Sequence, residues 1–140
     1  MTNSSDNMER RTVSRVLISV SDKTNIVNLA KELNKLDIEI VSTGGTSQVI
    51  SNEGINVTTV DTVTNFPEMM GGRVKTLHPL IFGGILARDE DKKEVEEHNI
   101  EIFDMVICNL YPFRAAISKN LDLNSIIQQI DIGGPSLLRA

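Results

Sequence analysis

Apolar residues form short continuous runs in the first sixty residues, and helical spacing appears between the runs. Residues 15–20 are almost all apolar, which is typical of a parallel strand buried on both faces. Apolar residues then recur every three or four positions and predict an amphipathic helix over residues 23–36. Residues 38–42 and 55–60 predict two further strands, with a short helix closed by Gly54 between them.

The second half of the chain continues this alternation after a long irregular region. Residues 89–97 are highly charged and predict a solvent-facing helix. Residues 103–108 predict a fourth strand, and two further helices are expected over residues 113–119 and 123–130. Alternating strands and helices with apolar strands predict an α/β fold with a doubly wound parallel sheet. Ligands of such folds bind at the carboxyl ends of the strands.

Length and charge limit the class of protein. The 140 residues suit one domain, so we predict a flexible tail over residues 1–13 and a single domain over residues 14–140. The net charge of −5 and the pI near 5.0 argue against binding to nucleic acid or to an anionic membrane. The chain has no apolar run long enough for a secretory signal or a membrane span. We therefore expect a soluble, cytoplasmic protein.

The cysteine and histidine residues do not predict a metal site. Cys108 is the only cysteine and lies in the apolar run at residues 103–108, which favours a buried, inert thiol over a nucleophile. The two histidines show no metal-ligand spacing with Cys108 or with each other. Metal catalysis is therefore not expected.

Residues 70–79 concentrate groups that could perform chemistry. Arg73 and Lys75 alternate, so in an extended backbone both cations would leave the same face, where they could hold an anion or a developing oxyanion. The adjacent Gly71 and Gly72 would let the backbone approach a ligand closely. For an isolated Arg-x-Lys pair, the alternative is a solvated loop whose charges alternate by chance.

Polar clusters directly follow three predicted strands, at residues 19–24, 42–47 and 109–113. In the first two clusters, hydroxyl groups meet the N–H groups of a helix N-terminus, where the macrodipole favours a phosphate, and Lys23 adds a full charge. Neither cluster is a Walker A loop or a dinucleotide fingerprint. We therefore predict a site for a mononucleotide-sized phosphate, with simple helix capping as the alternative for each cluster alone.

Tyr111 and Asp131 are two further candidates, and each has a structural alternative. Tyr111 is the only tyrosine and follows the fourth predicted strand, so its hydroxyl could enter the site or its ring could pack at the core edge. Asp131 lies between two isoleucines, which predicts a partly buried carboxylate with a functional role. Capping of the Gly-Gly-Pro turn that follows is the alternative.

Seven short blocks resemble, in order, the IMP cyclohydrolase domain. They are residues 20–24, 42–46, 66–69, 71–79, 84–88, 108–113 and 130–134. In that family the domain is the amino-terminal part of a bifunctional purine-biosynthesis enzyme, whose carboxyl-terminal part is an AICAR formyltransferase that uses folate. The resemblance implies a methylglyoxal-synthase-like, Rossmann-like three-layer fold that closes formyl-AICAR (FAICAR) to the purine nucleotide IMP with loss of water. It implies no cofactor for this step, and it implies a homodimer.

The reaction implied by this resemblance suggests roles for the candidate residues. Ring closure needs the carboxamide nitrogen to attack the formyl carbon while an oxyanion forms and later leaves as water. Lys75, with Arg73 and Thr76, would stabilise the oxyanion. The substrate phosphate is assigned, by the helix-terminus argument, to Ser19, Ser21, Lys23, Ser42, Thr43, Gly44, Gly45 and Thr46.

The remaining assignments concern the base and the proton transfers. Asp131 would orient or deprotonate the carboxamide, and Tyr111 would relay a proton. Asn109 would hold the base of the nucleotide, and Gly133 is the last of the predicted substrate-binding residues. Lys75, Tyr111 and Asp131 are thus the predicted catalytic residues.

The resemblance also carries an expectation about the end of the chain. The family continues beyond Ala140 with further alanines and a Lys-Asn pair whose lysine is catalytic, so we expect a chain truncated at its carboxyl end. A regulatory nucleotide-binding module of the same fold is the alternative, and it would need only the phosphate loops. Methylglyoxal synthase is a second alternative, but its acidic catalytic residues have no match after the early glycine-rich loops.

Overall fold

The computed structural model describes residues 12–140, so residues 1–11 of the predicted tail lie outside the described part. Its sheet has four parallel strands in the order β3-β2-β1-β4. The strands are β1 (Arg15–Ser19), β2 (Glu39–Ser42), β3 (Thr58–Thr59) and β4 (Met105–Cys108). The chain runs outward from β1 to β3 and then returns to place β4 on the other side of β1. The predicted parallel α/β sheet is confirmed.

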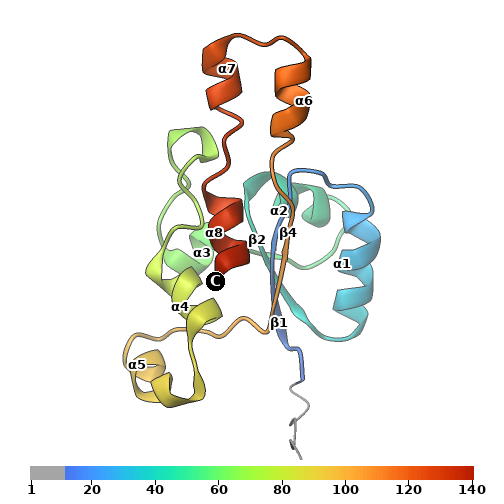
Figure 1. Ribbon diagram of the computed structural model, residues 1–140. Coiled ribbons are helices and arrows are strands. Elements are labelled where there is room, and N and C mark those ends of the chain that lie inside the picture. The colour runs from blue at the N-terminus through green and yellow to red at the C-terminus, as the bar shows by residue number, and fades with distance from the viewer. Residues whose placement is uncertain (1–11) are drawn as a thin grey trace, which may run out of the picture.

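Helices lie on both sides of this sheet, as Figure 1 shows. They are α1 (Ile26–Lys35), α2 (Gly44–Ser51), α3 (Val60–Thr64), α4 (Pro79–Leu86), α5 (Lys92–Glu97), α6 (Phe113–Ser118), α7 (Leu123–Ile127) and α8 (Gly133–Arg139). Two single-turn 3₁₀ helices, η1 (Met70–Gly72) and η2 (Asp89–Asp91), complete the elements.

Alternation along the central strands divides the core into two layers. Val16 and Ile18 of β1 point to one face and pack with the buried residues of α1 and α2. Leu17, between them, points to the other face and packs with residues such as Ile81 of α4 and Leu137 of α8. Because β1 is covered on both faces, its continuous apolar sequence is explained.

Several predicted elements begin or end elsewhere than expected, and the backbone explains three of the differences. Helix α1 starts at Ile26 rather than at residue 23, because Asn25 adopts the left-handed conformation (φ 60°). The predicted third strand over residues 55–60 is paired only at Thr58–Thr59, and Val60 already begins α3. Strand β4 starts at Met105, because the N–H of Phe103 donates to the carbonyl of Gly84 in α4.

Helices α3, α4 and α8 were not predicted. Helix α4 lies in the region expected to be irregular, where His78 accepts a hydrogen bond from the N–H of Leu80 and Pro79 occupies the first turn. Helix α8 begins at Gly133, where the sequence predicted only a Gly-Gly-Pro turn. Helices α4 and α8 cover the sheet face that α1 and α2 leave open.

Helices α6 and α7 pack against each other and form a hairpin that extends beyond the carboxyl edge of the sheet (Figure 1). Several of its large apolar side chains are exposed, among them Ile117, Leu121 and Leu123. None of the helices within residues 12–140 has the length and apolar character needed to cross a membrane.

Candidate active site

A cavity of about 800 Å³ opens at the carboxyl edge of the sheet, close to the ends of β1 and β4. This is where the strand order reverses, which is the usual ligand position in a parallel α/β sheet. The volume falls in the range of small-molecule sites. Among the predicted site residues, the following line the cavity: Ser19, Ser21, Lys23, Thr43, Gly45, Thr46, Arg73, Lys75, Thr76, Asn109, Tyr111, Asp131 and Gly133.

Two predicted phosphate ligands, Ser42 and Gly44, do not line the cavity. The Ser42 side chain is fully buried, and its hydroxyl donates to the carbonyl of Ile18 at 2.8 Å, which ties β2 to β1. The α-carbon of Gly44 faces Glu68 instead, because a β-carbon on Gly44 would lie 2.6 Å from Glu68 Oε2. Ser42 is therefore buried away from the cavity, whereas Gly44 is exposed but turns its α-carbon toward Glu68.

The first turn of α2 forms one wall of the cavity. Thr43 precedes the helix, and no described side chain caps it. The N–H groups of this turn can therefore bind an anion. Thr46 is held in place because its hydroxyl donates to the carbonyl of Val20 at 3.1 Å. This bond joins α2 to the loop after β1.

The loop after β1 brings a cation next to that helix terminus. Lys23 Nζ donates to the carbonyls of Val20 at 3.1 Å and Ser21 at 3.2 Å. The same ammonium lies 4.0 Å from the position that a β-carbon on Gly45 would occupy. The charge is thus held between the two loops predicted to bind phosphate.

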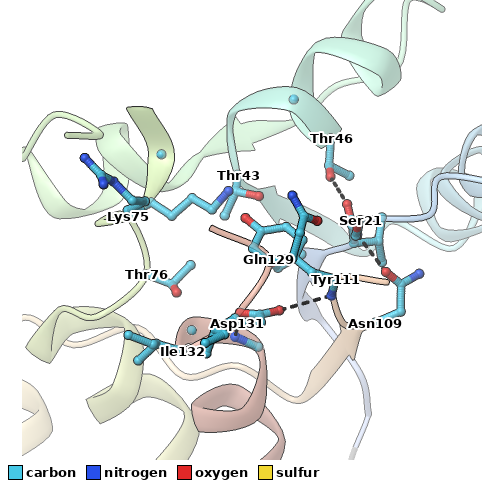
Figure 2. A pocket seen from close by; sticks show the side chains of 18 of the residues that line it. Ser21, Thr43, Thr46, Lys75, Thr76, Asn109, Tyr111, Gln129, Asp131 and Ile132 are labelled. Atoms are coloured by element: carbon cyan, nitrogen blue, oxygen red, sulfur yellow. Dashed lines mark hydrogen bonds between the residues drawn. The ribbon is translucent and has the colours of Figure 1, made fainter. Parts of the chain in front are cut away.

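Asn109, at the end of β4, is bonded to the loop after β1. Its Oδ1 accepts from the N–H groups of Ser21 at 2.6 Å and Asp22 at 3.1 Å, and its Nδ2 donates to the carbonyl of Asp22 at 2.8 Å. Figure 2 shows Asn109 beside Ser21 at the cavity edge. These three bonds give Asn109 a role in positioning the loop that the sequence did not predict.

Residues 69–74 form a tight turn rather than an extended strand. The backbones of Met69 and Val74 bond to each other in both directions, while Gly71 (φ 66°) and Gly72 (φ 84°) are left-handed. Arg73 has helical φ and ψ, so the expectation that Arg73 and Lys75 share one face of an extended backbone is wrong. Both side chains nevertheless line the cavity.

The two cations of this segment differ in their surroundings. Arg73 is exposed, and its Nε donates to the carbonyl of Met70 at 2.8 Å. Lys75 is half-buried, and its Nζ lies 3.9 Å from Glu68 Oε1. Lys75 points across the cavity toward the side of Thr43 (Figure 2).

Asp131 faces Lys75 from the opposite wall (Figure 2). Its Oδ1 accepts from the N–H of Gly134 at 2.8 Å, so the capping alternative for Asp131 is confirmed, although the capped element is helix α8. Its Oδ2 accepts a long bond of 3.4 Å from the N–H of Tyr111. The carboxylate is partly exposed to the cavity, so capping and ligand binding can coexist.

Cys108 lies behind Asp131. Burial, and next the charge of Asp131, raise the pKa of the Cys108 thiol, which keeps it protonated and unreactive. Its Sγ lies 3.8 Å from the carbonyl of Gly134. Cys108 is only partly buried, so the prediction of a buried thiol is met in part, and the raised pKa agrees with a thiol of low reactivity.

The segment between α7 and α8 carries the predicted Asp131, and it also adds cavity residues that were not individually predicted as site residues: Gln128, Gln129, Ile130 and Ile132. Figure 2 shows the Gln129 side chain between Lys75 and Tyr111. Neither glutamine follows a strand or belongs to a charged cluster, so nothing in the sequence pattern marked them. Residues 12–140 contain no group of three or more His, Cys, Asp or Glu side chains that could hold a metal ion.

Comparison with known proteins identifies similar chains. Residues 25–136 match the family model of the MGS-like domain. The chain is 56% identical over 129 residues to the bifunctional purine biosynthesis protein PurH of Persephonella marina, and 50% identical over 133 residues to that of Bacillus subtilis. These alignments cover 90% and 92% of this chain but 25% and 26% of the relatives, so it spans about a quarter of their length.

A solved structure is also similar. The crystal structure of ForH superposes with a TM-score of 0.76 at 34% sequence identity. The match covers 90% of this chain and 65% of ForH.

Proposed function

The chain belongs to the MGS-like domain family, and from this membership we propose that it is the IMP cyclohydrolase domain of a bifunctional purine biosynthesis protein. Its reaction would be the closure of FAICAR to IMP with loss of water. The observation that carries this proposal is the meeting of Lys75, Tyr111 and Asp131 with the two phosphate-type loops in one cavity. The 50–56% identity to PurH proteins supports it.

The geometry suggests how the substrate would lie. The 5′-phosphate binds at the first turn of α2. The backbone N–H groups between Thr43 and Thr46 and the Lys23 ammonium all face this position. The reacting end then extends toward the opposite wall, between Lys75 and Asp131. This orientation places the substrate's two polar ends against groups of suitable charge.

The chemistry follows from those two groups. The carboxamide nitrogen forms a bond to the formyl carbon and loses a proton, for which the Asp131 carboxylate is the acceptor on that wall. The formyl oxygen takes on negative charge, and the Lys75 ammonium stabilises it. That oxygen must gain two protons before its bond to carbon breaks and water leaves: one corresponds to the proton lost by the carboxamide nitrogen, and the other to the proton that the former formamide nitrogen loses as the carbon–nitrogen double bond forms. Tyr111 supplies a hydroxyl for proton transfer to that oxygen.

The test combines binding and turnover in one preparation. We expect IMP to bind in a calorimetric titration and FAICAR closure to be visible by absorbance. Lys75→Ala should lower kcat by about 10²- to 10³-fold, as the loss of an oxyanion-stabilising group does. Lys93→Ala on the exposed helix α5 is the control and should leave kcat unchanged.

Each contrary result has a distinct meaning. IMP binding without turnover would support the phosphate and base sites but would show that Lys75, Tyr111 and Asp131 do not suffice for catalysis. Near-normal turnover in the Lys75 variant would remove its assigned role. A folded sample that does not bind IMP would contradict the site assignment itself.

We further propose that the AICAR formyltransferase activity, with its folate cofactor, belongs to the part of such proteins that this chain does not span. The cyclohydrolase step itself would need no cofactor. We also propose that the protein is cytoplasmic. A homodimer is proposed separately, because the hairpin of α6 and α7 carries exposed apolar side chains that a second copy could cover.

A further inference from the structure

Glu68 does not line the cavity, yet its carboxylate touches two of the elements that form the cavity wall. It lies in the chain between α3 and the turn at residues 69–74. We propose that Glu68 is a positioning residue for Lys75, which fixes the Lys75 ammonium and joins its turn to the start of α2. This inference rests on the proposed function and deepens it.

The first contact is with Gly44 at the start of α2. A β-carbon on Gly44 would lie 2.6 Å from Glu68 Oε2, so the carboxylate packs directly on the glycine α-carbon. Gly44 has an ordinary helical backbone, so no left-handed φ distinguishes this position. A side chain there would have to displace the Glu68 carboxylate.

The second contact is with Gly72 in the turn before Lys75. A β-carbon on Gly72 would lie 2.6 Å from Glu68 Oε1 and 3.8 Å from Lys75 Nζ. The same Oε1 lies 3.9 Å from Lys75 Nζ. The Glu68 carboxylate therefore contacts Gly44 through Oε2. Its Oε1 contacts Gly72 and lies near the Lys75 ammonium.

This arrangement limits where the Lys75 ammonium can go. Glu68 is the only acidic side chain at ion-pair distance from Lys75 in the part of the chain that the structure describes. Both side chains are about one third exposed or less, so water screens the pair only partly. A lysine stem is flexible, and an ammonium that must meet a developing oxyanion benefits from being held before the reaction.

The first experiment measures FAICAR closure by Glu68→Ala and Glu68→Gln. Misplacement of a catalytic group can cost about 100-fold in rate, so we expect Glu68→Ala to lower kcat by about 10- to 100-fold while KM changes little. Glu68→Gln keeps the packing on both glycines and loses the charge, so its kcat should fall between those of wild type and Glu68→Ala. In a Lys75→Ala background, Glu68→Ala should cause no further loss.

The second experiment uses the contact between Glu68 and Gly44. Gly44→Ala should displace the carboxylate and lower kcat as Glu68→Ala does. In the double variant, the alanine methyl fits the space that the carboxylate left, so kcat should be no lower than in Glu68→Ala alone. Additive losses in this pair would contradict the packing argument.

A third readout does not depend on catalysis. Acetylation of Lys75, measured by mass spectrometry relative to the exposed Lys93, should increase in folded Glu68→Ala because the ammonium is released. If the wild-type protein does not close FAICAR, the proposed function fails. The ratio of Lys75 to Lys93 acetylation then still tests whether Glu68 holds the Lys75 ammonium. An unchanged ratio, or wild-type kcat in Glu68→Ala when wild type is active, would overturn the inference. A lower melting temperature with unchanged kcat would show a purely structural role and would overturn it too.

Discussion

At the scale of single residues, Asn109 decides which groups of the loop after β1 can meet a ligand. Its Oδ1 accepts hydrogen bonds from the N–H groups of Ser21 and Asp22, so these two donors are not free to bind a ligand. An anion at this loop must therefore be bound by hydroxyl groups, by the Lys23 ammonium and by the first turn of α2. Asn109 thus contributes to phosphate binding by fixing the loop.

This role predicts the effect of removing the amide. Asn109→Ala loses three hydrogen bonds, and we expect weaker IMP binding in calorimetry together with a loss of about 1–2 kcal/mol in the free energy of unfolding. Asn109→Asp keeps an acceptor for both N–H groups but loses the donor to the Asp22 carbonyl, so its IMP affinity should be intermediate. Wild-type affinity in Asn109→Ala would contradict the positioning role.

The sequence predicted most cavity residues because of a simple rule about parallel sheets. Polar residues that follow β1, β2 and β4 must meet at one edge, whatever the details of the loops. The rule does not say which way each side chain points, and it therefore included Ser42, whose hydroxyl turns into the sheet toward Ile18. It also has no information on Gln129, which reaches the cavity from a segment that follows no strand.

At the scale of elements, the amphipathic pattern predicted α1 correctly, whereas the sequence did not predict α4 and α8. Helix α1 has apolar residues on one side only, and its buried Ile26, Ala30 and Leu33 follow the expected spacing. Helix α4 is apolar on nearly all sides and contains two glycines, so it shows no amphipathic period. Helix α8 has Gly-Gly-Pro in its first turn, which local preferences associate with turns. Tertiary packing on the sheet stabilises both helices.

Helix α7 depends on a titratable cap, which gives a prediction about pH. Asp122 accepts hydrogen bonds from the hydroxyl of Ser125 at 2.5 Å and from its N–H at 3.1 Å, and these bonds hold the pKa of Asp122 below its ordinary value. Because the pKa is lower in the folded state, the cap stabilises above the unfolded pKa, and this contribution is lost as the pH falls through the folded pKa.

The measurement is an NMR titration of the Asp122 carboxyl group. Ser125→Ala removes the hydroxyl, which is the largest cause of the shift, so the pKa of Asp122 should rise toward its ordinary value while the N–H bond remains. Ser118→Ala on the neighbouring α6 is a control, since its hydroxyl bonds to the Arg114 carbonyl and should leave Asp122 unaffected. An unchanged Asp122 pKa in Ser125→Ala would show that the hydroxyl does not stabilise the carboxylate.

At the scale of the whole molecule, the fold concentrates positive charge against an acidic background. The chain carries a net charge of −5, yet Lys23, Arg73 and Lys75 all line one cavity. Lys23 is distant in sequence from Arg73 and Lys75, and the strand order and the turn at residues 69–74 bring it to the same cavity as those two. Such a local field attracts a small anion, while the overall charge repels extended polyanions. This arrangement suits a nucleotide monophosphate.

The hairpin of α6 and α7 carries exposed apolar side chains and is the expected interface of the proposed homodimer. Ile117 and Leu123 are 50% and 72% exposed, and neither lines the cavity. If the hairpin is part of the dimer interface, the double variant Ile117→Glu with Leu123→Glu places charges on apolar surface that the dimer buries. We expect sedimentation velocity to show a monomer for this variant and a dimer for the wild type. Leu36→Glu is a matched control, because Leu36 is 70% exposed at the end of α1, far from the hairpin in Figure 1. A monomeric wild type would contradict the dimer, and a dimer that only Leu36→Glu dissociates would place its interface on α1 instead.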